Sequence, residues 1–376
     1  MAAKNLIQIC LGQLNILPPA RASWFEFGPS SYINMPYPYF LGGASCPEIF
    51  NRFVGRTTDL PPFGCVVLND AYAYGDGLAI IDRYLLLEST ITAGPGDIGD
   101  WGFFSKVGPL INGERQISDW SLRTEHINEA VLLARRSDFV YGHWLLETLP
   151  RVRLAQRLCS DKAVYIVSHN SPEYQIDMLN ALGISGEQLY YLKPGEAVSC
   201  GKLFIPSIAH CSQNYVNKFA LETYNHLVSL CAGFAESSKD YGRIFVNRAS
   251  RKYDPRPLLN IEEVQAVAEQ SGFTVVDPGS IPWREQIAAF AQARAVIGLS
   301  GSGLHNTVYT SPNAHVMVLQ PNQSRNFLQT AIAGLVGHKV SYLFGESYSA
   351  FDKSSSECGY AIDPHLLSHV IAELGL

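Results

Sequence analysis

Apolar and polar positions follow their most regular pattern in the second half of the chain. Four short apolar runs predict buried strands: 243–247, 273–276, 295–299 and 315–319. Apolar residues at helical spacing predict helices between and after them: 258–269, 283–293, a short helix at 304–310, and a final helix at 364–374. Strands that alternate with helices favour an α/β fold with a parallel sheet covered on both faces.

The first half contains strand candidates separated by less regular segments. Apolar runs predict strands at 65–68, 78–87, 130–134, 163–167, 189–192 and 203–205. Helical patterns lie at 142–158, 172–182 and 215–231. Proline and glycine break both regular periods in 27–40, which predicts an irregular loop.

Domain boundaries are expected where small and polar residues interrupt the apolar pattern. The stretch 233–242 has this composition, and it separates an N-terminal domain, 1–235, from a C-terminal domain, 240–350. The remaining segment, 360–376, contains the final helix, and packing of this helix back on the N-terminal domain is one arrangement to test.

Composition excludes several classes of protein. Of the 376 residues, 47% are hydrophobic and 16% charged, which indicates a large core and excludes a disordered chain. A net charge of −6 gives no overall attraction to nucleic acid or to an anionic membrane, so any phosphate recognition must be local. No apolar run is long enough to span a membrane.

The cysteines and the N-terminus bear on location. The eight cysteines are scattered and none forms a C-x-x-C pair, which is typical of reduced thiols in a cytosolic protein. The apolar stretch 6–17 is interrupted by polar residues and makes a poor signal peptide. We therefore expect a cytoplasmic protein, with a place at the inner face of the membrane left open and the oligomeric state undetermined.

The strongest chemical signal is a glycine turn between a predicted strand and a helix. The turn and the helix start comprise Ser300, Gly301, Ser302, Gly303, Leu304, His305 and Asn306. Ligands of parallel sheets bind outside the carboxyl ends of the strands, and a helix start favours anions there. This pattern predicts a phosphate site, the alternative being that the glycines only allow the strand and helix to pack tightly.

Charged residues around the turn favour the phosphate interpretation. From 286 to 345 the sequence has no Asp or Glu, but it contains Arg294, Arg325 and Lys339. Arg248 and Arg251 directly follow the strand 243–247, and a parallel strand would bring them to the same sheet edge as the turn. Arginine suits bidentate contact with a diphosphate, although a solvated basic loop would have the same composition.

Other nucleotide motifs are incomplete. The turn has no third glycine at position 306, and no carboxylate follows about 20 residues later to hold a ribose, so an NAD site is disfavoured. An NAD(P)-dependent oxidoreductase with Arg325 on a 2′-phosphate remains a lesser alternative. No D-x-D occurs, so the usual carboxylate pair for a metal–diphosphate complex is missing.

A second group of functional candidates lies in the segment 142–151, GHWLLETLPR. His143 and Glu147 are four residues apart and share one face of a helix. A carboxylate in apolar surroundings can act as a general base. The pair can equally form a surface hydrogen bond or half of a metal site, but no third ligand is evident and we predict no metal.

Taken together, the segments 142–151, 247–264, 285–309 and 316–321 resemble family 61 glycosyltransferases. These are capsular-polysaccharide-type transferases of bacteria, with plant xylosyl- and arabinosyltransferases and animal protein GlcNAc transferases as relatives. The resemblance implies a GT-B architecture, in which two Rossmann-like domains face a cleft. It places the nucleotide-sugar in the C-terminal domain and the acceptor in the N-terminal one, and it implies inversion at the anomeric carbon without an essential metal or other cofactor.

The resemblance also implies roles for individual residues. The donor positions are Arg248, Arg251, Gly301, Ser302, Gly303 and Asn306, together with the neighbouring Leu304 and His305. Glu147 falls on an acidic position of the family, where it would be the catalytic base, oriented by His143. Two positions depart from the family pattern: Ser300 replaces a histidine, and Gln320 replaces an acidic residue.

The expected function is transfer of a sugar from a nucleotide-sugar, with a UDP-sugar as the first expectation, to a glycan hydroxyl in surface or capsular polysaccharide biosynthesis. The expected partners are therefore a nucleotide-sugar donor and a glycan acceptor, with no nucleic acid. Because Ser300 and Gln320 depart from the pattern, a non-catalytic glycan- or nucleotide-binding protein of the same fold is the competing class.

Overall fold

The computed structural model describes residues 4–9, 11–43, 55–75, 77–87, 111–117, 120–135, 137–211, 215–250, 257–324, 326–348 and 359–376. The chain divides into two units by its internal contacts: unit 1 is Met1–Ser31 with Leu60–Cys211, and unit 2 is Tyr32–Asp59 with Ser212–Leu376. Both units combine helices with a sheet, so the predicted α/β class is confirmed.

The division falls earlier in the chain than the boundary predicted at 235–240. Helix α5 (Ala220–Cys231) belongs to unit 2 because it packs on α7 (Trp283–Gln292). The ring of Tyr224 in α5 also meets that of Tyr309 edge-on, at 5.6 Å between centroids. A polar stretch such as 233–242 can thus be a surface connection within one unit.

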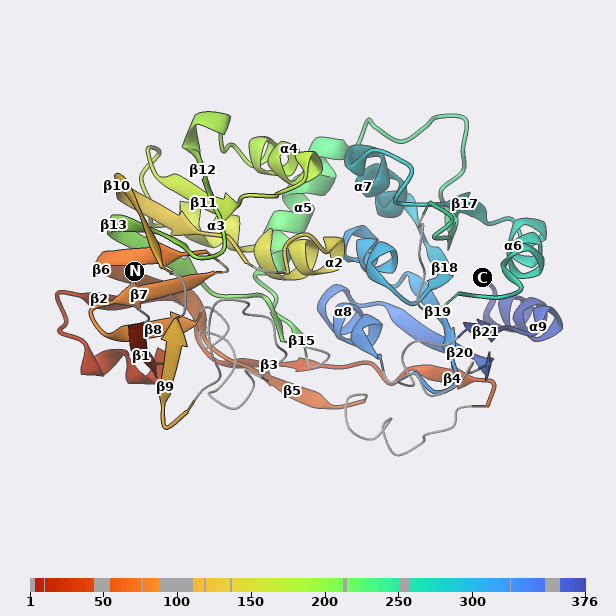
Figure 1. Ribbon diagram of the computed structural model, residues 1–376. Helices are drawn as coiled ribbons and strands as arrows, with labels where there is room; N and C mark the ends of the chain where they lie inside the picture. Colours follow the sequence, from red (N-terminus) through yellow and green to blue (C-terminus); the bar gives the residue numbers. More distant parts are fainter. Residues whose placement is uncertain are drawn as a thin grey trace. The chain divides into compact units, whose positions relative to one another are not determined.

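Unit 1 has a 10-stranded sheet in the order β12-β11-β10-β13-β6-β7-β8-β1-β9, with β2 beside β6 (Figure 1). Its strands are β1 (Lys4–Ile9), β2 (Ala22–Gly28), β6 (Phe63–Tyr74), β7 (Leu78–Ile81), β8 (Tyr84–Leu87), β9 (Glu114–Ile117), β10 (Ser121–Leu132), β11 (Val164–Ser168), β12 (Leu189–Leu192) and β13 (Glu196–Pro206). Its helices are η1 (Leu11–Ile16), α2 (Tyr141–His143), η3 (Trp144–Thr148), α3 (Arg151–Gln156), α4 (Glu173–Ala181) and η4 (Gly186–Gln188).

The sheet of unit 1 is mixed. The block β12-β11-β10-β13 is parallel, whereas β13, β6, β7 and β8 pair antiparallel in turn. Only the parallel block has the arrangement expected of a Rossmann-like domain. Alternating residues of these strands, such as Ala130 and Leu132 or Leu203 and Ile205, enter one core cluster, which explains the confirmed strand pattern.

Two predicted elements of unit 1 are divided in the structure. The apolar run 78–87 is the hairpin β7–β8, because Asp82 adopts a positive φ of 53° between the two strands. The predicted helix 142–158 is split into α2, the π-helical turn η3 and α3, which begins after Pro150.

Unit 2 has a 7-stranded sheet in the order β17-β16-β18-β19-β20-β21, with β4 beside β20 (Figure 1). Its strands are β4 (Tyr39–Leu41), β16 (Arg243–Val246), β17 (Thr274–Val276), β18 (Ala295–Leu299), β19 (His315–Pro321), β20 (Lys339–Tyr348) and β21 (Gly359–Ala361). The remaining helices are α6 (Ile261–Gln270), η5 (Ser302–Tyr309), α8 (Leu328–Val336) and α9 (Pro364–Leu374). The remaining strands are β3 (Ser31–Asn34), β5 (Thr57–Leu60), β14 (His210–Cys211) and β15 (Tyr215–Val216).

The strands from β17 to β20 are all parallel, as the alternating pattern predicts. Helices α6 and α9 pack together on one face of this sheet, so the final helix is part of unit 2. The other face meets η5, since Leu304 packs against Gly298 of β18. Strands β17 and β18 flank β16 on opposite sides, which is a topological switch point.

Several elements were not expected from the pattern. Strand β20 and helix α8 were missed, and the stretch 27–40, expected to be irregular, contains β3 and β4. None of the helices in the described ranges has the length and apolar character that a membrane crossing requires.

Candidate functional site

The first candidate site lies at the carboxyl ends of two parallel strands in unit 1. Strands β10 and β13 are neighbours, with Val131 opposite Phe204 near their ends. Strand β10 leads through Arg135 into α2 and η3, and β13 leads to His210 in β14. Because segments that follow parallel strands meet at one sheet edge, residues distant in sequence come together there.

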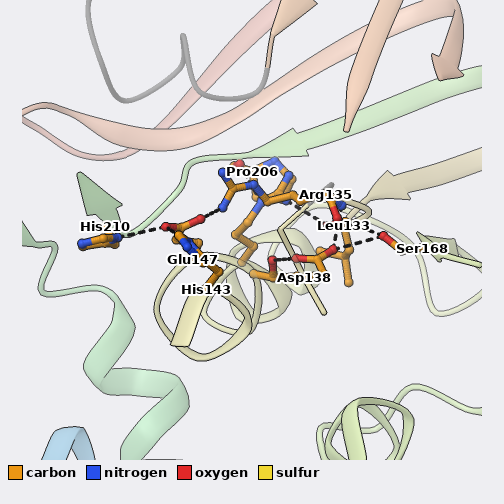
Figure 2. Close-up of polar contacts among 10 residues, drawn as sticks. Leu133, Arg135, Asp138, His143, Glu147, Ser168, Pro206 and His210 are labelled. Carbon is orange, nitrogen blue, oxygen red and sulfur yellow. Dashed lines mark hydrogen bonds and ion pairs between the residues drawn. The ribbon is translucent and has the colours of Figure 1, made fainter. Parts of the chain in front are cut away.

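Glu147 is the centre of this site (Figure 2). Its Oε1 lies 2.7 Å from Nδ1 of His143 and 3.0 Å from Nδ1 of His210. Its Oε2 accepts a hydrogen bond from Nη1 of Arg135, which forms an ion pair with the carboxylate. The structure therefore brings the predicted pair together and adds two residues that the sequence analysis missed.

The missed residues had a weak signal in the sequence. Arg135 directly follows the predicted strand 130–134, and His210 follows the predicted strand 203–205 by five residues. Polar residues just beyond strand ends are candidates for a site, but nothing local indicates that these two strands are adjacent.

The electrostatics of the cluster depend on its burial. Glu147 is 6% exposed, and the Arg135 guanidinium compensates a charge that would be costly to bury alone. Partial burial, together with the charges of Arg135 and His210, lowers the pKa of His143 from 6.5 to about 4, so this ring is neutral at pH 7. Over the described ranges, no group of three or more His, Cys, Asp and Glu residues could hold a metal ion.

Buried polar residues hold the segment that carries the cluster. Asp138 is 3% exposed and accepts hydrogen bonds from the backbone N–H of Arg135, at 2.6 Å, and from Oγ1 of Thr148, at 2.5 Å. Arg151 is fully buried and donates to main-chain carbonyl oxygens at the carboxyl ends of both β10 and β13. These bonds tie the helical segment to the sheet edge and thereby position Glu147.

The second candidate site lies at the switch point of unit 2. Val246 and Gly298 are paired near the carboxyl ends of β16 and β18, and the chain continues to Arg248 and to the glycine turn. A methyl group placed on Gly301 would lie 3.1 Å from Nη1 of Arg248. The expectation that Arg248 and the turn share one sheet edge thus agrees with the geometry of this unit.

Hydrogen bonds hold both segments of the second site in place: the loop after β16 and the start of η5. The backbone N–H of Arg248 donates to Oδ1 of Asn247 at 2.6 Å, and Ser250 donates to the Asp277 carboxylate through its N–H, at 2.5 Å, and through its Oγ, at 2.9 Å. Asn306 donates to Oε1 of Gln286 at 3.1 Å beneath the turn. The loop after β16 and the start of η5 are therefore both anchored.

The other predicted donor residues occupy different environments. Leu304 and Asn306 are fully buried and support the turn, while Ser302, Gly303 and His305 are partly exposed. The Ser300 backbone N–H donates to the Leu319 carbonyl, and Gln320 is fully buried at the end of β19. Arg251 and Arg325 lie outside the described residues.

Two of the cations expected near the turn, Arg294 and Lys339, lie away from it. Arg294 precedes β18 and Lys339 begins β20, and the register of the sheet places both at its amino edge, opposite the turn. A stretch without carboxylates is therefore not a positive surface at the turn by itself, because cations at the start of a strand lie at the edge opposite the turn. Of the cations described in that stretch and just after β16, Arg248 is the one shown against the turn.

Comparison with known families identifies the class of protein. Residues 141–317 match the family model described as Glycosyltransferase 61. This matched segment includes Glu147, His143 and His210, as well as Arg248 and the glycine turn, whereas Arg135 precedes it. The resemblance seen in the motifs is thereby confirmed over this segment, which covers slightly less than half of the chain and supports a family 61 glycosyltransferase. Comparison with curated proteins gives no match.

Proposed function

We propose that the chain is an inverting glycosyltransferase that moves a sugar from a nucleotide-sugar to a hydroxyl of a glycan in surface or capsular polysaccharide biosynthesis. The observation on which this rests is the approach of Arg248 to Gly301 at the switch point of unit 2. α/β sheets bind ligands in the crevice at such a point, and a helix start there favours phosphate. UDP-sugars are the first donors to test.

The donor site suits a leaving group that gains negative charge. As the bond between the sugar and the diphosphate breaks, the Arg248 guanidinium can donate two hydrogen bonds to phosphate oxygens. The first N–H groups of η5 have no partners within the helix and face the same edge. We propose that these groups stabilise the departing diphosphate without an essential metal, so transfer should persist in EDTA.

The acceptor hydroxyl must lose its proton as it attacks the anomeric carbon. Glu147 and His143 form the titratable pair proposed for this step, and general-base assistance contributes roughly 10²–10⁴ in rate. Attack on the face opposite the diphosphate inverts the configuration of the sugar.

A transfer assay over a panel of nucleotide-sugars and oligosaccharide acceptors tests this function. We expect release of nucleoside diphosphate that depends on the acceptor, and a product whose anomeric configuration by NMR is opposite to that of the donor. Retained configuration would contradict the inverting mechanism.

A non-catalytic nucleotide- or glycan-binding protein is the second candidate. It is favoured by Ser300 and Gln320, which are buried beside the turn and depart from the residues that the family resemblance implies. Tight binding of a nucleoside diphosphate without release from any donor would support this candidate over the transferase.

A further inference from the structure

The oxygens of Glu147 are occupied by three nitrogen donors. Oε1 is shared by Nδ1 of His143 and Nδ1 of His210, and Oε2 is bound by Arg135. To take a proton from an acceptor hydroxyl, the carboxylate would have to give up one of these donors. Its neighbours therefore make Glu147 a poor choice for the atom that first receives the proton.

The contact with Glu147 sets the tautomer of His143. An ionised carboxylate only accepts hydrogen bonds, so a neutral ring that contacts it through Nδ1 carries its hydrogen there. The lone pair of the neutral His143 ring is then on Nε2, pointing away from Glu147. This ring has the electronic form of a general base held by a carboxylate.

Access distinguishes the two rings. The side chain of His143 is 45% exposed, whereas the side chains of His210 and Glu147 are each 8% exposed. The His143 ring is therefore the group of the cluster that is most open to an acceptor hydroxyl. His210 and Arg135 instead enclose the carboxylate and fix its direction.

We propose that His143 is the residue that takes the proton from the acceptor hydroxyl, through Nε2, and that Glu147 is a positioning residue that orients the ring. This inference rests on the proposed glycosyl transfer. The acceptor oxygen forms its bond to the anomeric carbon while its proton moves to Nε2. The bond from that carbon to the diphosphate breaks, and the diphosphate leaves with the electron pair. Glu147 faces the resulting imidazolium, which returns its proton to water.

The lowered pKa of His143 leaves the ring neutral at pH 7, with its hydrogen on Nδ1 and its lone pair on Nε2. The groups that face the ring are Glu147, Arg135 and His210, and only the carboxylate favours the protonated form. Its contact is the one that would stabilise the ring after proton transfer.

Chemical rescue can separate the two possible bases. In His143→Ala we expect transfer to fall roughly 10²–10⁴-fold and added imidazole to restore it several-fold, with the restored rate rising with pH as free imidazole loses its proton. In Glu147→Ala we expect a loss that added formate does not restore. His169→Ala, which removes an exposed histidine of the same unit outside the cluster, should behave like the unaltered chain.

The proposal would be overturned if formate restored Glu147→Ala while imidazole left His143→Ala inactive, since Glu147 would then be the base. Transfer by the unaltered chain tests the proposed function separately, so failure of either idea can be recognised. Circular dichroism of the variants confirms that each one is folded before rescue is attempted.

Discussion

Removal of the Arg248 side chain is the most direct test of the donor site. In Arg248→Ala the turn at Gly301 keeps its main chain, but a guanidinium whose Nη1 lies close to that glycine is lost. A hydrogen bond to a charged group contributes about 1.5–3 kcal/mol. Since about 1.4 kcal/mol corresponds to tenfold in affinity, the dissociation constant for UDP should rise roughly 10- to 100-fold.

Isothermal titration calorimetry with UDP measures this change in affinity, and two further variants serve as controls. Arg248→Lys keeps the charge but not the planar fork, so its affinity should be intermediate. Arg294→Ala removes an exposed arginine from the amino edge of the same sheet and should bind UDP as the unaltered chain does. Equal affinities for Arg248→Ala and Arg294→Ala would refute the donor site.

Three other perturbations have definite expected outcomes. Glu147→Gln should lower turnover roughly 10²–10⁴-fold. Its affinity for UDP should not change, because the cluster that it disrupts lies in unit 1. Normal turnover would show that the cluster has no part in catalysis. Gly298→Ala places a methyl group 2.8 Å from atoms of both η5 and β16, so urea unfolding should show a free energy of unfolding that is lower by roughly 1–3 kcal/mol. Gly233→Ala is the control, because its new methyl group has no atom within 4 Å, and its free energy of unfolding should show no comparable loss. Burial lowers the pKa values of His315 and His338 from 6.5 to about 4. The unfolded chain therefore binds more protons between these values, and the free energy of unfolding should fall by roughly 2 kcal/mol for each ring from pH 7 to pH 5; a free energy that does not change with pH would contradict this.

The fold of unit 2 was largely predictable because its signals are local. Strands β18 and β19 and helix α7 appear in the sequence as short apolar runs or helical spacing between turn residues. Strand β20 and helix α8 were missed, although the run 339–345 is mostly buried. Unit 1 was harder to predict, since the direction in which β6 and β7 pair does not follow from the pattern of either strand.

The candidate site of unit 1 shows the same contrast among its residues. His143 and Glu147 could be paired from their spacing of four on a helix. Arg135 is 12 residues and His210 is 63 residues from Glu147, and neither stands at a spacing that relates it to the carboxylate.

The sequence by itself determined the α/β class, the parallel strands of unit 2, the position of the glycine turn and the His143–Glu147 pair. All of these depend on residues within about one helix or strand of one another. The tertiary structure alone decided that α5 belongs to unit 2, that Arg294 and Lys339 lie at the edge opposite the turn, and that Arg135 and His210 enclose Glu147. The physical reason is that side-chain periodicity acts over a few residues, whereas the order and direction of strands depend on hydrogen bonds and packing between segments far apart in the chain.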